Sequence, residues 1–315
     1  MKDSMIIHPE ELSKAWIDRL AEFRVPTLGI HPVGGKSAVS SLTELVQKAA
    51  TTEYRKLIDY AKSKGLEIEY EVHSAGYLLP RELFSSHPEY FRENEKGERV
   101  NDFNFCVSNS EALDVFAKRA AKLATNLYGS RHDFYFWMDD GRGLQCHCEK
   151  CRNLSPSDQQ LIALNQAIKA IRKYIPDARI SYLAYCDSVI PPTKVNAEKG
   201  IFLEYAPFEK YVAKGDGAAE RIKHEKEMLV PLMRFFSGEP CKVLEYWYDN
   251  SLLSSWKKPP KRFVLNEEGM RADIEEYHRI GFSTVSTFAC YLGQDYEELH
   301  GAFDVKPFAE FIYKK

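Results

Sequence analysis

The sequence predicts an α/β protein folded as a single (β/α)8 TIM barrel. Strand-like runs alternate with helical segments along the whole chain, which is typical of a parallel sheet. Eight such units over about 290 residues give each unit about the length that a barrel repeat needs. No glycine-rich dinucleotide turn follows the first predicted strand, which argues against the alternative, a doubly wound open sheet. Because no linker or composition shift divides the chain, we expect one domain over residues 1–315.

The predicted strands are short runs of apolar or alternating residues that end at turn residues. The first ends at Gly34-Gly35, and the second, Glu-Ile-Glu-Tyr-Glu-Val-His, alternates along its length. The fourth contains the apolar run Phe-Tyr-Phe-Trp-Met, which makes its end well defined. The eight strands are predicted at 25–33, 67–73, 103–107, 133–138, 178–186, 200–205, 241–248 and 282–290.

The predicted helices carry start and stop signals between these strands. Asn109 or Ser110 can cap one helix, and a Ser-Pro-Ser sequence precedes the next, while Gly65 and Gly281 occupy the usual position after a helix ends. A segment at 80–91 with two prolines is predicted as a short helical or irregular insertion. Helices are predicted at 42–64, 110–128, 157–174, 218–236 and 266–280, with a last helical segment towards the C-terminus.

Composition excludes several classes of protein. Hydrophobic residues make up 44% of the 315 residues and charged residues 28%, so the chain can bury a core and is not disordered. The net charge of 43 − 46 = −3 disfavours a nucleic-acid partner. No apolar run is long enough for a membrane span, and the N-terminus lacks the apolar core of a signal peptide, so a cytoplasmic protein is expected. The sequence leaves the oligomeric state unspecified.

Carboxylates gather where the predicted strands end, the place at which barrel enzymes carry their catalytic groups. Asp139 and Asp140 directly follow a strand, and close carboxylates raise one another's pKa, which yields one proton donor and one anion. Glu204 and Glu245 each stand before Tyr in an apolar strand, and facing the barrel mouth would relieve their burial. The alternatives are a solvated Asp-Asp-Gly turn and glutamates paired with cations on the helix-facing side. The catalytic candidates are Asp139, Asp140, Glu245 and Glu204.

Aromatic and polar side chains at the same strand ends suit sugar binding, because aromatic rings stack on the faces of sugar rings. Structural histidines and core tryptophans are the alternative interpretation of several of them. The substrate-binding candidates are His31, His73, Tyr185, Asp187, Tyr205, Trp247 and Asn250.

Four of the seven cysteines suggest a metal site. Cys146, Cys148 and Cys151 lie in a cysteine-rich loop at about 141–156, after the fourth predicted strand, and Cys106 lies at the end of the third. Four thiolates around one Zn²⁺ would form a closed structural site that supports the neighbouring aspartates. Free thiols, a disulfide and an iron–sulfur cluster are the alternatives, and no organic cofactor is expected.

Three motifs carry a family resemblance: His-Pro-Glu-Tyr-Phe at 87–91, Phe-Cys-Val-Ser-Asn at 105–109, and Asp139-Asp140-Gly141 leading into the Cys-x-Cys-x-x-Cys loop. They resemble a bacterial domain family of unassigned function in the glycoside-hydrolase TIM-barrel superfamily, which is distantly similar to α-glucuronidases and β-N-acetylhexosaminidases. The Asp-Asp pair is similar to the paired acids of O-GlcNAc hydrolases.

These observations together predict a glycoside hydrolase with a carbohydrate substrate, an N-acetylhexosaminide or a uronide. Asp140 is the expected general acid, Asp139 would orient the substrate, and Glu245 or Glu204 would serve as nucleophile or base. Two alternatives remain at this point. One is a non-catalytic carbohydrate-binding barrel that uses Trp247, Tyr185 and Tyr205, and the other is a metal-dependent carbohydrate deacetylase built on histidines and aspartates.

Overall fold

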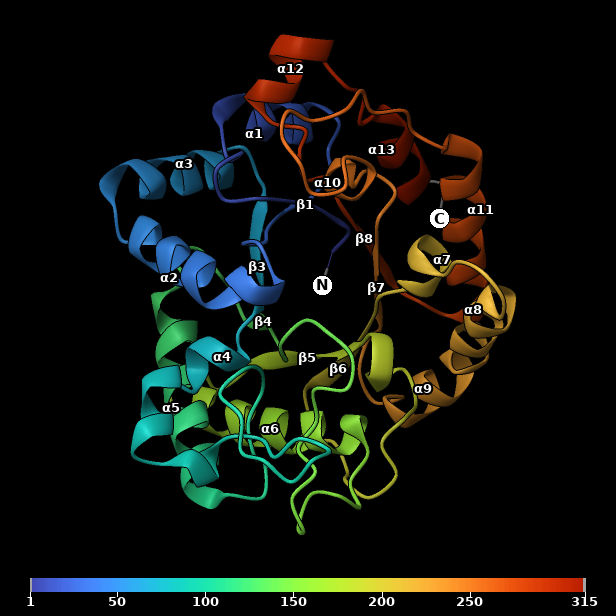
Figure 1. The fold of residues 1–315 in the computed structure, drawn as a ribbon. Helices are drawn as coiled ribbons and strands as arrows, with labels where there is room; N and C mark the ends of the chain where they lie inside the picture. Colours follow the sequence, from blue (N-terminus) through green and yellow to red (C-terminus); the bar gives the residue numbers. More distant parts are fainter. Residues whose placement is uncertain (1, 314–315) are drawn as a thin grey trace.

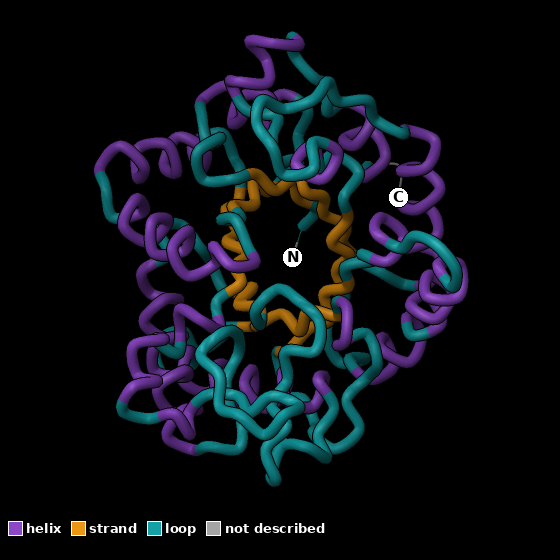
Figure 2. The backbone as a smooth tube through the Cα atoms, viewed as in Figure 1, coloured by secondary structure: helices purple, strands orange, loops and turns teal. Residues whose placement is uncertain are grey.

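The computed structural model describes residues 2–313, in which eight parallel strands close into a barrel in chain order (Figures 1 and 2). The eighth strand pairs with the first, so the sheet has no free edge. The strands are β1 (Ser4–Ile7), β2 (Thr27–Ile30), β3 (Glu67–His73), β4 (Asp133–Trp137), β5 (Arg179–Ala184), β6 (Ile201–Tyr205), β7 (Lys242–Glu245) and β8 (Thr284–Phe288). The predicted fold class is confirmed.

Helices surround the barrel in a ring, as Figure 2 shows. The helices are α1 (Lys14–Glu22), α2 (Ala38–Ala49), α3 (Thr52–Ser63), α4 (Ala75–Leu78), α5 (Ser110–Asn126), α6 (Pro156–Ile171), α7 (Glu209–Val212), α8 (Ala218–Glu227), α9 (Leu229–Phe235), α10 (Asn250–Leu253), α11 (Glu267–Ile280), α12 (Gln294–His300) and α13 (Lys306–Ile312). Short 3₁₀ turns occur at Gly35–Ser37, Arg81–Ser85, Pro88–Tyr90 and Cys186–Ser188. No helix in the described part of the chain combines the length and apolarity needed to cross a bilayer.

One strand assigned from sequence is wrong, and one strand of the structure was not assigned. Residues 103–107 lie in the long connection between β3 and α5 and form no strand. The missing strand is β1, whose four residues near the N-terminus are too few to show a periodic pattern. The predicted number of eight strands is therefore correct, although one of the eight predicted strands is not a strand in the structure.

Two predicted helices are each divided in the structure. The stretch 42–64 consists of α2 and α3, because Thr51 leaves the helical conformation and its side chain caps α3 through the N–H of Tyr54. The stretch 218–236 consists of α8 and α9, and Pro231 lies in the first turn of α9, where a missing N–H is tolerated.

Side chains on each strand alternate between the barrel interior and the surrounding helices. On β7, Lys242 and Leu244 point inward, where Leu244 packs with Ile6 and Trp137, whereas Val243 packs in the outer core. On β2 the inward position is Gly29, at which a Cβ would lie 2.6 Å from Cγ1 of Ile6. This alternation decides which strand residues can reach the carboxyl-end mouth of the barrel.

Candidate active site

A cavity of about 380 Å³ opens at the carboxyl ends of the barrel strands, within the size range of ligand pockets. Residues from every part of the barrel contribute to it. It is lined by His8, His31, Val33, Gly34, Gly35, His73, Trp137, Asp140, Leu183, Tyr185, Ala206, Phe208, Leu244, Tyr246, Asp249, Ser251, Leu252, Trp256, Phe288, Cys290 and Tyr291.

Two carboxylates line this cavity, Asp140 after β4 and Asp249 after β7. Asp140 is half-buried, and its Oδ1 accepts a hydrogen bond from the hydroxyl of Tyr185 at 3.0 Å. Asp249 caps α10, and its Oδ1 accepts from the N–H and hydroxyl of Ser251, at 2.9 and 2.6 Å, and from the N–H of Leu252 at 3.2 Å. Burial raises the pKa of Asp249, and these three donors oppose that rise.

Three histidines from neighbouring strands form a row along one side of the cavity. Each Nδ1 atom lies 2.7 Å from a backbone oxygen. His8 contacts the oxygen of His31, His31 contacts that of Glu71, and His73 contacts that of Met138. A carbonyl oxygen only accepts, so Nδ1 carries the proton, and Nε2 of the neutral ring is left with a lone pair. Burial and the neighbouring histidines lower the pKa of His31 well below its usual value, so that ring stays neutral.

The opposite wall of the cavity is aromatic. Tyr185, Phe208, Tyr246 and Phe288 follow one another with ring centroids 5.1, 5.5 and 5.3 Å apart. Burial raises the pKa of Tyr246 far above its usual value, so its hydroxyl remains protonated and can donate. The cavity thus combines carboxylates, histidines and aromatic faces.

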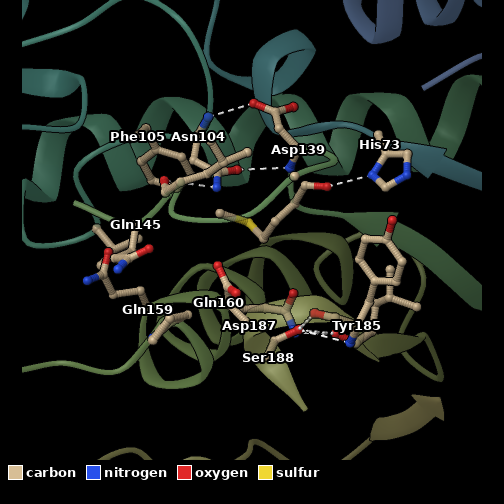
Figure 3. Close-up of a pocket in the computed structure, with 16 residues that line it drawn as sticks. His73, Asn104, Phe105, Asp139, Gln145, Gln159, Gln160, Tyr185, Asp187 and Ser188 are labelled. Carbon is tan, nitrogen blue, oxygen red and sulfur yellow. Dashed lines mark hydrogen bonds between the residues drawn. The ribbon is translucent and has the colours of Figure 1, made fainter. Parts of the chain in front are cut away.

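Asp139 does not line the main cavity with Asp140, as the prediction of an adjacent acid pair requires, but the smaller hollow beside it. Its Oδ1 accepts from the N–H of Gly76 at 3.0 Å and its Oδ2 from the N–H of Asn104 at 2.6 Å, with Arg81 at 3.5 Å. Figure 3 shows its carboxylate turned towards Asn104 and away from Tyr185. Adjacent residues at the end of a strand point in opposite directions, so the pair is divided between the cavity and the loop after β3.

Glu204 lies inside the barrel but below the mouth, so the prediction that it faces the mouth is corrected. Its Oε2 accepts from Nε1 of Trp137 at 2.8 Å, and its Oε1 lies 3.8 Å from Nζ of Lys242. Lys242 also contacts Glu69 at 2.9 Å and Glu71 at 2.6 Å. The next inward position, Ala206 directly after β6, is the one that reaches the cavity.

Glu245 points outward from β7, which corrects its predicted place at the mouth. It is fully buried against the outer helices, where it binds Lys210 on α7 and accepts from the hydroxyls of Tyr211 and Tyr277. The helix-facing glutamate paired with a cation was the alternative interpretation, and the structure favours it. Tyr246, the next residue on the chain, faces the cavity instead.

Three predicted binding residues also lie outside the cavity. Tyr205 is buried and donates to Glu225 on α8, and Nε1 of Trp247 donates to Asp273 on α11, both facing the helix layer. Asn250 is buried in α10, and its Nδ2 donates to the backbone oxygens of Lys261 and Tyr291. Asn250 therefore holds two loops at the rim and does not reach the space inside.

Of the candidate binding residues, His31, His73 and Tyr185 line the cavity, and Asp187 lines a smaller neighbouring hollow of about 60 Å³ (Figure 3). Oδ2 of Asp187 accepts from the N–H of Gly143 at 2.6 Å, and its other oxygen lies 3.8 Å from Arg142. Asp187 thus fastens the loop after β4. This hollow shares His73 and Tyr185 with the main cavity.

Four buried thiols form the predicted cysteine cluster and could hold a metal ion. The Sγ atoms of Cys106, Cys146, Cys148 and Cys151 all lie within 4.8 Å of one another. Cys106 is 3.6 Å from Cys148 and 4.0 Å from Cys151, too far for a disulfide. Within residues 2–313 no other group of three or more His, Cys, Asp or Glu ligand atoms gathers this closely, so the histidine row lacks the geometry that the deacetylase alternative requires.

Sequence reasoning missed three residues of the site: His8, Asp249 as a cavity carboxylate, and Tyr246. His8 was overlooked because β1 was not recognised, although the same Ile-His-Pro sequence ends both β1 and β2. Asp249 stands four residues beyond the end of β7, in a loop whose course the sequence does not reveal. Side chains alternate along β7, so Tyr246 lies on the same face as Lys242. The sequence alone does not show that Lys242 points into the barrel.

The fold is similar to those of solved glycosidases. A β-galactosidase from the psychrophilic Marinomonas ef1 matches 99% of this chain with a TM-score of 0.59 and 13% identity. A β-galactosidase from Rahnella sp. R3 also matches 99% of this chain, with a TM-score of 0.57 and 13% identity. This chain covers only 58% and 55% of those two chains. Endo-glycoceramidase II from Rhodococcus sp. matches with 0.54 at 9% identity, over 99% of this chain and 78% of the other. Such low identities show a shared fold alone.

Sequence comparison with curated proteins found no match. A family model does match residues 31–226, more than half of the chain and including all four clustered cysteines and the Asp139-Asp140 pair. The chain belongs to the DUF4838 family, a domain family of unknown function.

Proposed function

We propose that this protein is a glycoside hydrolase whose carboxylate pair is Asp140 and Asp249. The observation that carries the proposal is that, of the residues lining the cavity, these two are the carboxylates, and they enter it from the ends of β4 and β7. Most glycoside hydrolases use such a pair, which flanks the bond that is cleaved. The similarity of the fold to solved glycosidases supports the same reaction class.

Asp140 serves as the general acid, and Asp249 serves as the nucleophile or base. Asp249 accepts three hydrogen bonds on one oxygen, which stabilise its ionised form and fix its orientation. Asp140 accepts one bond, from the hydroxyl of Tyr185, and keeps its second oxygen for the leaving group. The second carboxylate is therefore Asp249, in place of Glu245 or Glu204.

The sugar held in the cavity is uncharged, and an N-acetylhexosaminide fits better than a uronide. The described residues that line the cavity include no lysine or arginine that could pair with a uronate carboxylate. The histidine row turns its Nε2 atoms to sugar hydroxyls, with a lone pair on the neutral ring of His31, and the aromatic wall covers the apolar face of the sugar ring.

Sugar release by purified protein tests this function. Aryl glycosides and oligosaccharides, including hexosaminides and uronides, would be incubated with the wild type and with the Asp140→Asn, Asp249→Asn and Asp177→Asn variants. Asp177 is an exposed carboxylate paired with His132 and is the matched control. We expect the first two variants to lose about 10²- to 10⁴-fold in rate and the control to lose nothing. Release of no sugar by the wild type, or full activity of either cavity variant, would contradict the proposal.

We further propose that the four clustered thiols hold a structural zinc ion. Sulfur atoms around a tetrahedral zinc with Zn–S of about 2.3 Å lie about 3.8 Å apart, and the Cys106 pairs at 3.6 and 4.0 Å fit this spacing. The N–H of Glu93 points at Sγ of Cys146, and Ser108 lies beside two of the thiols, as expected around thiolates. Four sulfur ligands close the site, so zinc would join the loops after β3 and β4 without touching substrate.

Elemental analysis tests the zinc proposal independently of activity. Protein purified without added metal is expected to contain one zinc per chain, and Cys148→Ser to contain much less and to unfold at a lower temperature. Cys241→Ser, at a buried thiol outside the cluster, is the control that keeps its zinc. Iron, or no metal, in the wild type would refute zinc.

A further inference from the structure

A tryptophan stands at the rim of the cavity with most of its surface in solvent. Trp256 follows α10, lines the cavity and is 60% exposed. Figure 1 places α10 at the mouth of the barrel. A large apolar ring exposed at the entrance to a polar cavity indicates a contact surface for a ligand that extends out of it.

The backbone that presents this ring is strained. Ser255 and Trp256 have φ of 54° and 53°, in the left-handed region that non-glycine residues rarely adopt. The turn is held by the N–H of Trp256, which donates to the oxygen of Ser251 at 2.8 Å, and by the N–H of Lys261, which donates to Oγ of Ser254 at 3.0 Å. Strain kept at a ligand-facing residue favours a functional explanation of its position.

The position of Trp256 is tied to that of Asp249. Asp249 caps α10 through Ser251, and the oxygen of Ser251 in turn accepts from Trp256. Asn250 fixes the far end of the same loop through the oxygen of Lys261. Asp249 and Trp256 both line the cavity, so a ligand that reaches Asp249 and extends outward can meet a Trp256 ring held by the same loop.

The segment after Trp256 is strongly basic. It runs Lys257-Lys258-Pro-Pro-Lys261-Arg262, in a chain whose net charge is −3. Lys258 pairs with Asp295 and Lys261 donates to the oxygen of Leu253, whereas Lys257 and Arg262 are exposed and form no ion pair within residues 2–313. The cavity wall itself presents no lysine or arginine. The ligand is therefore neutral inside the cavity and can be anionic at the rim.

We propose that Trp256, Lys257 and Arg262 form a second sugar subsite, which binds an acidic sugar of the leaving group. Trp256 stacks on the ring, and the two cations pair with its carboxylate or sulfate. The proposal rests on the proposed function, because that function makes the rim a place for the leaving group. The substrate class it assigns is an acidic oligosaccharide with an uncharged sugar in the cavity.

Binding to the Asp140→Asn protein, in which turnover is suppressed, tests the subsite. The probes are hexasaccharides of hyaluronan, which carries carboxylates, of chondroitin sulfate, which adds sulfates, and of neutral N-acetylchitohexaose, together with monomeric N-acetylglucosamine. Calorimetry in 50 mM salt is expected to show at least about tenfold tighter binding of an acidic than of the neutral hexasaccharide. Which acidic probe binds more tightly identifies the anion.

Variants separate stacking from charge. Trp256→Ala is expected to weaken every hexasaccharide by about tenfold or more and to leave the monosaccharide unchanged. The double change Lys257→Gln with Arg262→Gln is expected to remove only the preference for acidic hexasaccharides. The control is Lys223→Gln with Arg271→Gln, at exposed sites on α8 and α11, which should leave that preference intact. Equal binding of all hexasaccharides by the wild type and Trp256→Ala overturns the subsite, as does binding of no probe.

The outcome is distinct from that of the test for the proposed function. Wild-type protein that releases no sugar but binds acidic hexasaccharides through Trp256 would refute hydrolysis and keep the subsite. Protein that hydrolyses aryl glycosides but binds hexasaccharides no better than the monosaccharide would keep hydrolysis and refute the subsite.

Discussion

The carboxylates at the mouth of the barrel and those within its walls differ in what they bind. Asp140 and Asp249 face a cavity and accept hydrogen bonds from neutral donors. Glu204 and Glu245 are fully buried, and each lies close to a lysine, Lys242 and Lys210. A carboxylate that binds a cation is neutralised within the fold, whereas one held only by neutral donors at a cavity remains available to a ligand.

The difference arises from depth and direction along a strand. Glu204 points inward, but it lies one inward position before the mouth, and Glu245 points outward. Ala206, two residues after Glu204, lines the cavity, and so does Tyr246, the residue after Glu245. Small displacements along a strand therefore separate structural from ligand-facing carboxylates.

The largest expected effect comes from Lys242→Met, which removes the cation that neutralises Glu69 and Glu71. Uncompensated buried carboxylates should cost about 3–5 kcal/mol of unfolding free energy. Denaturant unfolding at pH 7 measures the loss, and at pH 5 it should shrink, because burial raises the pKa of Glu71 and allows it to protonate. Lys210→Met removes a half-buried lysine beside Glu245 and is expected to cost less. An unchanged free energy of unfolding in Lys242→Met would contradict the neutralising role of the lysine.

The next effect is a pH dependence from Glu204, whose pKa burial raises to about 7 from 4.5. The folded state holds its proton more tightly, so this group stabilises the fold fully below pH 4.5 and loses that contribution as the pH rises through about 7. Glu204→Gln should therefore gain about 2–3 kcal/mol relative to wild type between pH 5 and pH 8. Thermal unfolding across this range checks it, and a constant difference between the two proteins would be the contrary result.

A smaller effect separates the two adjacent aspartates. Asp139→Asn should destabilise the fold by about 1–2 kcal/mol, since Asp139 accepts from the N–H groups of Gly76 and Asn104 and an amide can satisfy only one of them well. Asp140→Asn should leave stability within about 0.5 kcal/mol of wild type. Chemical denaturation of both variants compares them, and the reverse order would invalidate the placement of Asp139 as structural.

The smallest effect concerns the hydroxyl of Ser251, which donates to Asp249. Ser251→Ala removes this bond and raises the pKa of Asp249 further, so the acid limb of kcat/KM should move about 0.5–1 pH unit upward. Rates on a hydrolysed aryl glycoside at pH 4–8 measure it. Ser251→Thr keeps the hydroxyl and should keep the limb in place, and an unmoved limb in the alanine variant would argue against an ionised Asp249 in the reaction.

Much of the fold followed from local patterns. Runs such as Phe-Tyr-Phe-Trp-Met and the cap at Asn109 fix β4 and α5 through burial and hydrogen bonding within a few residues. The cysteine cluster was also predictable, because three of its thiols lie within six residues. By contrast, β1 is four residues long and becomes a strand only by pairing with β2 and β8.

The sequence by itself determined the fold class, the cysteine cluster and Asp140, His31, His73 and Tyr185 as residues of the barrel mouth. Only the tertiary structure decided that Asp249 joins Asp140 while Asp139, Glu204 and Glu245 do not. The physical reason is that strand position depends on pairing with neighbours distant in sequence. That pairing sets whether a buried carboxylate meets a lysine, an N–H group or the open cavity.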